Sequence, residues 1–277
     1  MKVSLKGVRG SIPTTGADTA YFGGHTSCIT VEENGWMLVL DGGSGMPGVS
    51  LPKTTKRVDI LLTHLHLDHL QGLGFFRPLF DPSMEVHIWG PASATQSLYS
   101  RISRYLSPPL FPVLIRELPC KLTMHDIANS SFEIGPFSID SRYVIHPGPT
   151  IGYRIRVNDS VLAYIPDHEP ALGPSGIIPD NKWVSGFDLV FEADLLLHDG
   201  QYTTQEYKAR IGWGHSSMED TIKLASLSGV KRLLLTHHDP SHTDTQLNEI
   251  YAGLLRTNGD HLSFDMAREG MEIELGS

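Results

Sequence analysis

The chain has 277 residues, of which 40% are hydrophobic and 19% charged, a composition typical of an ordinary globular protein. Its formal net charge of −9 excludes the broad positive field that drives nonspecific binding to nucleic acids. No apolar run reaches the roughly 18 residues of a membrane span, and Met1–Val8 lacks the apolar core of a signal peptide. Two cysteines, Cys28 and Cys120, are too few for a disulfide scaffold. We therefore expect a cytoplasmic protein without membrane association.

The first third of the chain predicts mainly strands. Cys28–Glu32 and Trp36–Leu40 are apolar runs around Asn34-Gly35, which is a strong hairpin signal. Val58–Thr63 and Glu85–Trp89 are the next predicted strands. No internal repeat or long linker interrupts the chain, so we expect one domain over residues 1–277.

Two helices and a loop are expected around these strands. A helix is predicted to begin at His69 and to run through Leu73, and a second to span Ser93–Leu106 with Ser93 as its N-cap. Leu106–Val113 contains three prolines and is expected to be a loop that packs over another part of the protein, with the functional site as the candidate.

The remainder changes from strands to alternating strands and helices. Phe132–Ile145, Gly152–Val157 and Val161–Ile165 predict successive antiparallel strands, and Asp194–His198 and Val230–Thr236 predict two more. Two capping boxes predict helices, the first opening at Ser216 and ending at Gly229, the second opening at Thr243 and ending at Gly259. This order is consistent with two sheets packed face to face and helices outside.

A histidine cluster follows the strand Val58–Thr63. If the backbone stays extended, the side chains of His64, His66 and Asp68 point the same way, and His69 comes next. Imidazole and carboxylate groups suit zinc, and four of them exceed what one open catalytic zinc needs from a single loop. The segment therefore predicts two metal ions.

The segment resembles the His-x-His-x-Asp-His signature of the metallo-β-lactamase superfamily, and further motifs of that family occur in order along the chain. The resemblance implies an α/β protein with a four-layer αββα sandwich. Asp41, after the strand Trp36–Leu40, resembles an early aspartate that supports the ligand loop in this family.

The same resemblance implies the ligand set. His146 would join His64 and His66 on the first metal, and Asp167 would bridge both metals. His237 would join Asp68 and His69 on the second, with the adjacent His238 as the alternative. Zinc is the expected metal; manganese and iron stay open, because ligand type alone does not settle the choice.

Asp199 and His215 resemble an acidic residue and a histidine of the tRNA 3′-end endonuclease and small phosphodiesterase branch, although the endonuclease pattern has glutamate at the first position. The resemblance places His215 near the leaving phosphate oxygen, with Asp199 acting only through it. A predicted helix N-terminus beside His215 favours an anion there. Together with Asp68, these two are the candidate catalytic residues.

These features predict a dinuclear hydrolase that cleaves a phosphodiester by a hydroxide bridging the metals. The acidic charge and the lack of a basic inserted arm favour a small cyclic phosphate or nucleotide over nucleic acid. Gly7–Pro13 and Gly23–Ser27 also resemble segments of phosphoribosyl cyclic phosphate and cyclic nucleotide phosphodiesterases. A homodimer stays open.

Three alternatives remain. A tRNA 3′-end processing endonuclease would use the same site. Glyoxalase-type thioesterases share all seven ligands but carry a helical extension for glutathione that we do not find. Binding proteins on this fold usually lose metal ligands, and this chain has lost none.

Overall fold

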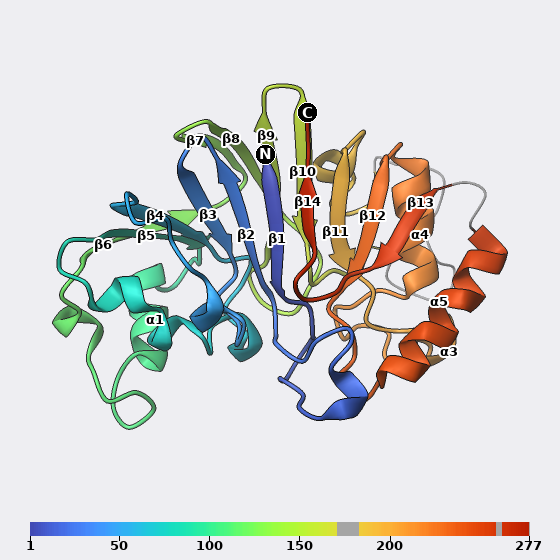
Figure 1. Ribbon diagram of the computed structural model, residues 1–277, viewed down its shortest axis with the longest axis horizontal. Coiled ribbons are helices and arrows are strands. Elements are labelled where there is room, and N and C mark those ends of the chain that lie inside the picture. Colours follow the sequence, from blue (N-terminus) through green and yellow to red (C-terminus); the bar gives the residue numbers. More distant parts are fainter. Residues whose placement is uncertain (171–182, 259–261, 277) are drawn as a thin grey trace.

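The computed structural model, which describes residues 1–170, 183–258 and 262–276, contains two seven-stranded mixed sheets that face each other (Figure 1). The first sheet has the order β14 (Glu272–Glu274), β1 (Lys2–Gly7), β2 (Cys28–Glu33), β3 (Trp36–Leu40), β4 (Arg57–Leu61), β5 (Glu85–Pro91) and β6 (Lys121–Ile127). The second has the order β13 (Ser263–Met266), β12 (Arg232–Thr236), β11 (Leu195–Asp199), β10 (Ser160–Ile165), β9 (Ile151–Val157), β8 (Phe137–Tyr143) and β7 (Ser130–Ile134).

Each sheet has a parallel half and an antiparallel half. Strands β3 to β6 are parallel to one another, and so are β10 to β13. The remaining neighbours are antiparallel, including the β2–β3 hairpin. Its turn residues Asn34 and Gly35 have φ of 47° and 81°, the left-handed pair that a tight hairpin turn requires, so the predicted hairpin is confirmed.

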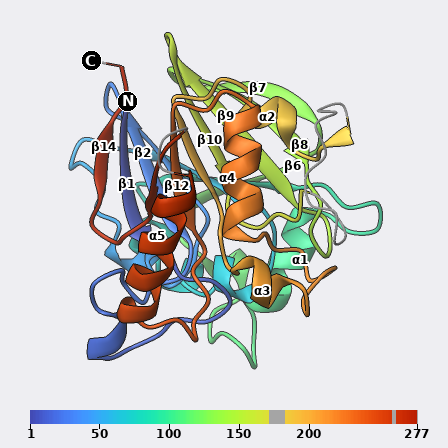
Figure 2. The same ribbon diagram turned by 90° about the vertical axis from the view of Figure 1, so that its right-hand side faces the viewer.

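Helices lie on the outer faces of both sheets (Figures 1 and 2). The first sheet is covered by α1 (Leu98–Tyr105) and short 3-10 turns. The second sheet is covered by α2 (Phe187–Val190), α4 (Met218–Leu227) and α5 (Asp244–Asn258), with α3 (Thr204–Tyr207) preceding α4. The 3-10 turns are η1 (Ala17–Thr19), η2 (Met46–Gly48), η3 (Leu67–His69), η4 (Leu73–Phe75), η5 (Arg77–Phe80) and η6 (Ile115–Glu117).

Buried apolar side chains fill three spaces between these layers. One cluster combines residues of both sheets, such as Leu40 and Tyr153, and therefore forms the core between them. A second joins the other face of the β10–β13 sheet to α2, α4 and α5, and a third joins the β2–β5 face to α1. This arrangement of helix, sheet, sheet and helix confirms the predicted αββα sandwich.

The histidine loop differs from its prediction. The expected helix from His69 through Leu73 is wrong, because the chain forms the 3-10 turns η3 and η4 there. The amide of Gly72 donates to the carbonyl of Gly42, and the amide of Gly42 donates to the carbonyl of His69. Backbone groups that a helix would use internally thus bind the turn after β3 instead.

Two other boundaries are also wrong. The helix predicted over Ser93–Leu106 begins only at Leu98, because Ser97, not Ser93, accepts the capping hydrogen bond from the amide of Ser100. The strand predicted over Phe132–Ile145 is two strands, β7 and β8, which reverse at Gly135 with φ of 52°.

The two capping boxes fare differently. Ser217, not Ser216, caps α4, because the hydroxyl of Ser216 is engaged with the carbonyl of His168. The box of Thr243 and Gln246 at the start of α5 is confirmed. Gly259, expected to end that helix, lies outside the described residues.

The proline-rich loop after α1 packs on the first sheet's outer layer. Phe111 is buried, and its ring meets Phe75 of η4 edge-on at 5.9 Å between centroids. Strands β1, β6, β13 and β14 were not predicted. Among the described residues, no helix combines the length and the apolar character of a membrane span.

Candidate metal centre

The predicted ligands lie where strands of both sheets end. His64, His66, Asp68 and His69 follow β4 of the first sheet, and His146, Asp167 and His237 follow β8, β10 and β12 of the second. The last three strands run in one direction, because β8 and β10 are each antiparallel to β9 and β10 to β12 are parallel. Their carboxyl ends therefore share one edge, which faces the loop after β4.

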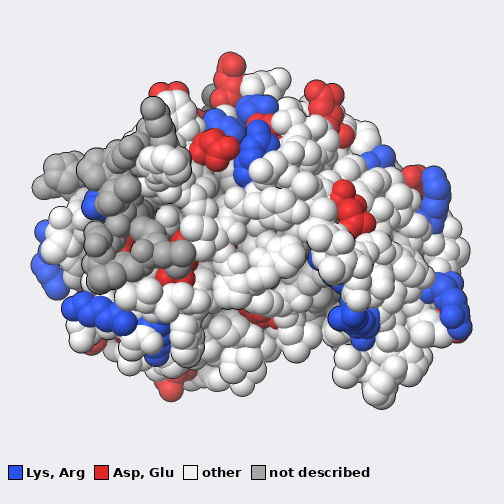
Figure 3. Space-filling view, turned by 180° about the vertical axis from the view of Figure 1, so that it is seen from behind, with Lys and Arg blue, Asp and Glu red and all other residues white. Residues whose placement is uncertain are grey.

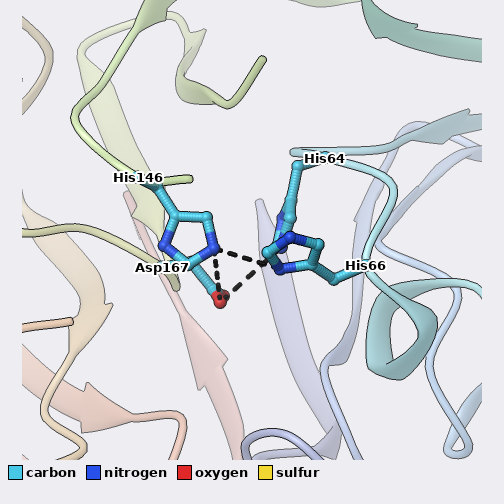
Figure 4. A group of neighbouring side chains, drawn as sticks. All are labelled: His64, His66, His146 and Asp167. Carbon is cyan, nitrogen blue, oxygen red and sulfur yellow. Dashed lines mark hydrogen bonds and ion pairs between the residues drawn. The ribbon is translucent and has the colours of Figure 1, made fainter. Parts of the chain in front are cut away.

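The first group contains His64, His66, His146 and Asp167, which point toward one another (Figure 4). Nε2 of His146 lies 3.1 Å from Nδ1 of His66. Nε2 of His64 and Nε2 of His146 each lie 3.7 Å from Oδ2 of Asp167. Three imidazoles and one carboxylate thus surround one point.

The second group contains Asp68, His69, His237 and, again, Asp167. Nε2 of His69 lies 3.0 Å from Oδ1 of Asp167 and 3.4 Å from Oδ2 of Asp68. Nε2 of His237 lies 3.3 Å from Oδ2 of Asp167. Asp167 therefore belongs to both groups, which is the place that a bridging carboxylate needs.

The donor atoms fit metal ions. In each group the candidate ligand atoms all lie within 4.8 Å of one another. Within the described part of the chain, Nε2 of His64, His69 and His237 and Oδ1 of Asp167 are buried without a hydrogen bond. Buried polar atoms without partners are costly, and imidazole and carboxylate are donors that divalent cations such as zinc accept. The fold and this His/Asp cluster therefore indicate divalent-metal binding.

Charge at the site leads to the same conclusion. Burial lowers the pKa of His64 well below its usual value and that of His146 to about 4, so both rings are neutral at pH 7 and offer a lone pair. His69 behaves oppositely: burial opposes its charge, but the carboxylates of Asp167, Asp41 and Asp68 raise its pKa well above the usual range. Three carboxylates around one ring require positive charge at this place.

Asp41 supports the ligand loop as the resemblance implied. One carboxylate oxygen accepts from the amide of Thr63 at 2.8 Å, and the other lies 2.9 Å from Nδ1 of His69 and accepts from the hydroxyl of Tyr164 at 2.8 Å. Its own backbone is left-handed, with φ of 59°. A carboxylate on Nδ1 fixes the ring so that Nε2 faces the second group.

His237, and not His238, lies in the second group. Nε2 of His238 donates to the carbonyl of Ala267 at 2.8 Å, so that ring is used elsewhere. The backbone of His237 is left-handed, with φ of 61°. A Cβ on Gly10 would lie 2.5 Å from Cδ2 of the His237 ring, so only glycine fits there.

The N-terminal segment also contacts the candidate ligand Asp68, and this contact was not predicted. The amide of Ser11 donates to Oδ2 of Asp68 at 2.9 Å. Arg9, completely buried, donates to the carbonyls of Gly23 and His242 at 2.8 Å each and so fixes this segment. The motif Gly7–Pro13 was visible in the sequence, but not its contact with the metal-binding loop.

Asp199 and His215 form a pair beside these groups. Nδ1 of His215 lies 2.7 Å from Oδ2 of Asp199 and 4.0 Å from Oδ2 of Asp167. Asp199 also accepts hydrogen bonds from the amides of His168, Gln201 and Ser216. Asp199 therefore also organises the backbone around the site, a contribution that the sequence did not reveal.

Glu169 is a further residue that the sequence did not reveal. It is 1% exposed, and its carboxylate accepts from the amides of Gly212 and Gly214 at 2.8 Å each and from the hydroxyl of Tyr207 at 2.7 Å. The carbonyl of Gly214 in turn accepts from Nδ1 of His146 at 2.7 Å. Glu169 thus connects the loop before His215 to a candidate ligand.

Comparison with known families agrees with this geometry. The beta-lactamase superfamily domain matches residues 43–238, which include every candidate ligand. The chain belongs to this superfamily. It is a hydrolase, as its sequence predicted.

Individual relatives are more distant. A ribonuclease Z of Gemmatimonas aurantiaca is 26% identical, with 90% of each chain covered. The solved structure of human tRNase Z, short form, has a TM-score of 0.69 at 20% identity and full coverage of both chains. A diphosphatase of the PhnP family has a TM-score of 0.71 at 18% identity, with 99% of this chain and 98% of that chain covered. The two structural likenesses show the fold.

Proposed function

We propose that this protein hydrolyses a phosphodiester, and that its natural substrate is a small one such as a cyclic phosphate or nucleotide. The observation that carries the proposal is the position of His215, whose ring is held by Asp199 and lies beside Asp167, the residue common to both ligand groups. A site that only stores metal has no use for a charged, oriented histidine at this place.

The proposed cofactor is a pair of divalent metal ions, and zinc is the metal that we propose for both positions. The first would be held by His64, His66, His146 and Asp167, and the second by Asp68, His69, Asp167 and His237. When bound, such a pair neutralises phosphate charge and makes water a nucleophile at neutral pH. Asp68 would serve as a ligand, and its carboxylate accepts a hydrogen bond from the amide of Ser11, which holds the N-terminal segment beside it.

His215 has the role of proton donor. Burial opposes its charge, but the carboxylate of Asp199, with those of Asp167 and Asp68, raises its pKa to about 9, so the ring is protonated at pH 7. Nδ1 is committed to Asp199, which leaves Nε2 to donate to the leaving oxygen or to hold the charge of the transition state. This role needs an alkoxide leaving group, as a ribose oxygen supplies.

A small substrate is favoured by charge. The chain is acidic overall, and on the face shown in Figure 3 the described Lys and Arg side chains form only small groups, interspersed with Asp and Glu, and no broad basic region. Endonuclease activity on a tRNA 3′ end is the second candidate, because curated relatives that match most of the chain are named ribonuclease Z.

A substrate panel tests both candidates. We expect the zinc-loaded protein to hydrolyse bis(p-nitrophenyl) phosphate faster than p-nitrophenyl phosphate, because the described residues supply no dedicated basic clamp for the monoester's extra charge. Cyclic nucleotides, phosphoribosyl cyclic phosphate and precursor tRNA then rank the natural substrates. Rapid cleavage of a thioester or β-lactam without diester turnover would refute the proposal.

A further inference from the structure

Trp213 stands two residues before His215, and its indole is 60% exposed. Among the described residues it has no hydrogen-bond or ring partner for that indole. Single exposed apolar side chains are common and need no explanation. Here, however, hydrogen bonds to a buried carboxylate hold the loop that carries the indole.

Glu169 restrains this loop from the protein interior. Its buried carboxylate binds the amides of Gly212 and Gly214, the two residues on either side of Trp213. Both glycines are left-handed, with φ of 86° and 88°, and the amide of Trp213 donates to the carbonyl of Arg210 at 3.0 Å. The backbone at Trp213 is thus fixed on both sides, while its large side chain is left in solvent.

Other exposed apolar side chains belong to residues that are adjacent in the sequence to residues of the same site. Leu67, 61% exposed, lies between two candidate ligands, and Ile145, 38% exposed, directly precedes His146. Ile12, 60% exposed, follows Ser11, whose amide binds Asp68. The segments that carry the site therefore also expose apolar surface, which suits a ligand with an apolar part.

The position of Trp213 indicates which part of the ligand it would meet. Trp213 belongs to the segment of His215, which we place at the leaving oxygen, and Gly214 between them is in contact with His146. A planar indole provides a stacking surface for a planar aromatic ring, and every nucleobase has such a face. Arg210 nearby is already occupied, since its guanidinium stacks on Tyr202 and donates to the carbonyl of Glu206.

We propose that Trp213 is a substrate-binding residue that stacks on the nucleobase of a nucleoside phosphodiester, on the leaving-group side of the site. This inference rests on the proposed phosphodiesterase function and specifies its substrate class. Glu169 is the positioning residue that holds this surface beside His215.

The test uses two cyclic diesters that share their leaving oxygen. One is adenosine 2′,3′-cyclic phosphate, and the other is the same ribose cyclic phosphate with methoxy in place of adenine. Stacking of one base contributes about 1–3 kcal/mol, so Trp213→Ala should raise KM for the nucleotide roughly 5- to 150-fold. KM for the base-free diester should change less than about twofold by the same reasoning, because it has no ring to stack.

Two variants serve as controls. Trp213→Phe keeps an aromatic face and should recover most of the lost affinity for the nucleotide. Trp36→Ala removes an equally large side chain from the start of β3, the end of the strand remote from Asp41, and should leave both KM values unchanged. An equal effect of Trp213→Ala on both diesters, or no effect on either, would overturn the inference while the phosphodiesterase function stands.

A different result is expected if the proposed phosphodiesterase activity itself is wrong. If the metal-loaded protein hydrolyses no diester of the substrate panel, the proposed activity is wrong, and the inference is then decided by binding. Adenosine monophosphate should bind more tightly than ribose phosphate by calorimetry, and Trp213→Ala should remove that difference. Equal affinities for the two ligands in the unmodified protein would refute the stacking role.

Discussion

Asp199 holds His215 through Nδ1 at 2.7 Å, and Nε2 of the same ring has no hydrogen-bond partner among the described residues. An imidazole fixed at one nitrogen and free at the other is oriented to give a proton to a bound substrate. The pair lies beside the ligand groups without belonging to either, so its chemistry can be separated from metal binding.

Removing His215 should reduce the rate without removing metal. We expect His215→Ala to keep both metal equivalents and to lower kcat by roughly 10²–10⁴-fold, the usual contribution of a general acid. The loss should be smaller for a p-nitrophenyl ester, whose leaving group needs little protonation, than for an alkyl ester. Elemental analysis beside kinetics on both esters checks this. Loss of metal would instead make His215 a ligand, and equal losses would mean that it only holds the phosphate.

The pH profile should depend on Asp199. Because the acid form of His215 is the active one and its pKa is raised to about 9, activity should persist at neutral pH and fall as the pH rises through that value. Asp199→Asn removes the negative charge that raises this pKa, so the alkaline fall should move to lower pH. The profile of kcat/KM measures the shift, and an unchanged alkaline limb would exclude the assigned pairing.

The same variant should also cost stability. An asparagine has one carbonyl oxygen for the amides of His168, Gln201 and Ser216, whereas Asp199 offers two carboxylate oxygens. We expect the free energy of unfolding to fall by about 1–3 kcal/mol, the range for a buried amide left without its partner. Urea denaturation of the metal-loaded protein provides the measurement.

Asp167 should be necessary for metal loading. Because its carboxylate belongs to both ligand groups, Asp167→Ala should lower the metal content below two equivalents per chain and abolish turnover. Elemental analysis after dialysis, with activity on the same sample, checks both statements. A fully loaded and active variant would remove Asp167 from the centre.

Gly10 should be necessary for the second metal. A Cβ at this position would lie 2.7 Å from Nε2 of His237, the atom that we assign to the metal. Gly10→Ala should therefore weaken the second equivalent and lower activity, while the first group stays loaded. Gly48→Ala is the matched control, because a Cβ there meets nothing within 4 Å. Equal metal affinity of the two variants would show that the His237 ring can move aside without consequence.

The site residues that could be predicted from spacing alone are those that lie close together in the sequence. His64, His66, Asp68 and His69 stand within six residues at a strand end, so their spacing alone brought them together. His146 and Asp167 needed the resemblance, because their approach to the cluster depends on how β8 and β10 pack against the other sheet.

The contributions of Ser11, Gly10 and Glu169 could not be predicted in this way. Each acts through contacts between segments far apart in the chain, by a backbone amide, by the lack of a side chain, or by a carboxylate under a loop. The capping serine of α4 was misplaced for a related reason. Ser216 has the right chemistry for a cap, but its hydroxyl is engaged with the carbonyl of His168.

The origin of the ligands from both sheets has a consequence for folding thermodynamics. An ion held by His64 from one sheet and His146 from the other acts as a cross-link between them, as a disulfide does between two loops. An ion at a thousandfold excess over its dissociation constant adds about 4 kcal/mol to the free energy of unfolding. The melting temperature is then a function of metal supply, and a chelator should lower it. Destabilising substitutions in the core between the sheets should be tolerated in metal-rich medium, whereas the same variants should unfold when metal is scarce.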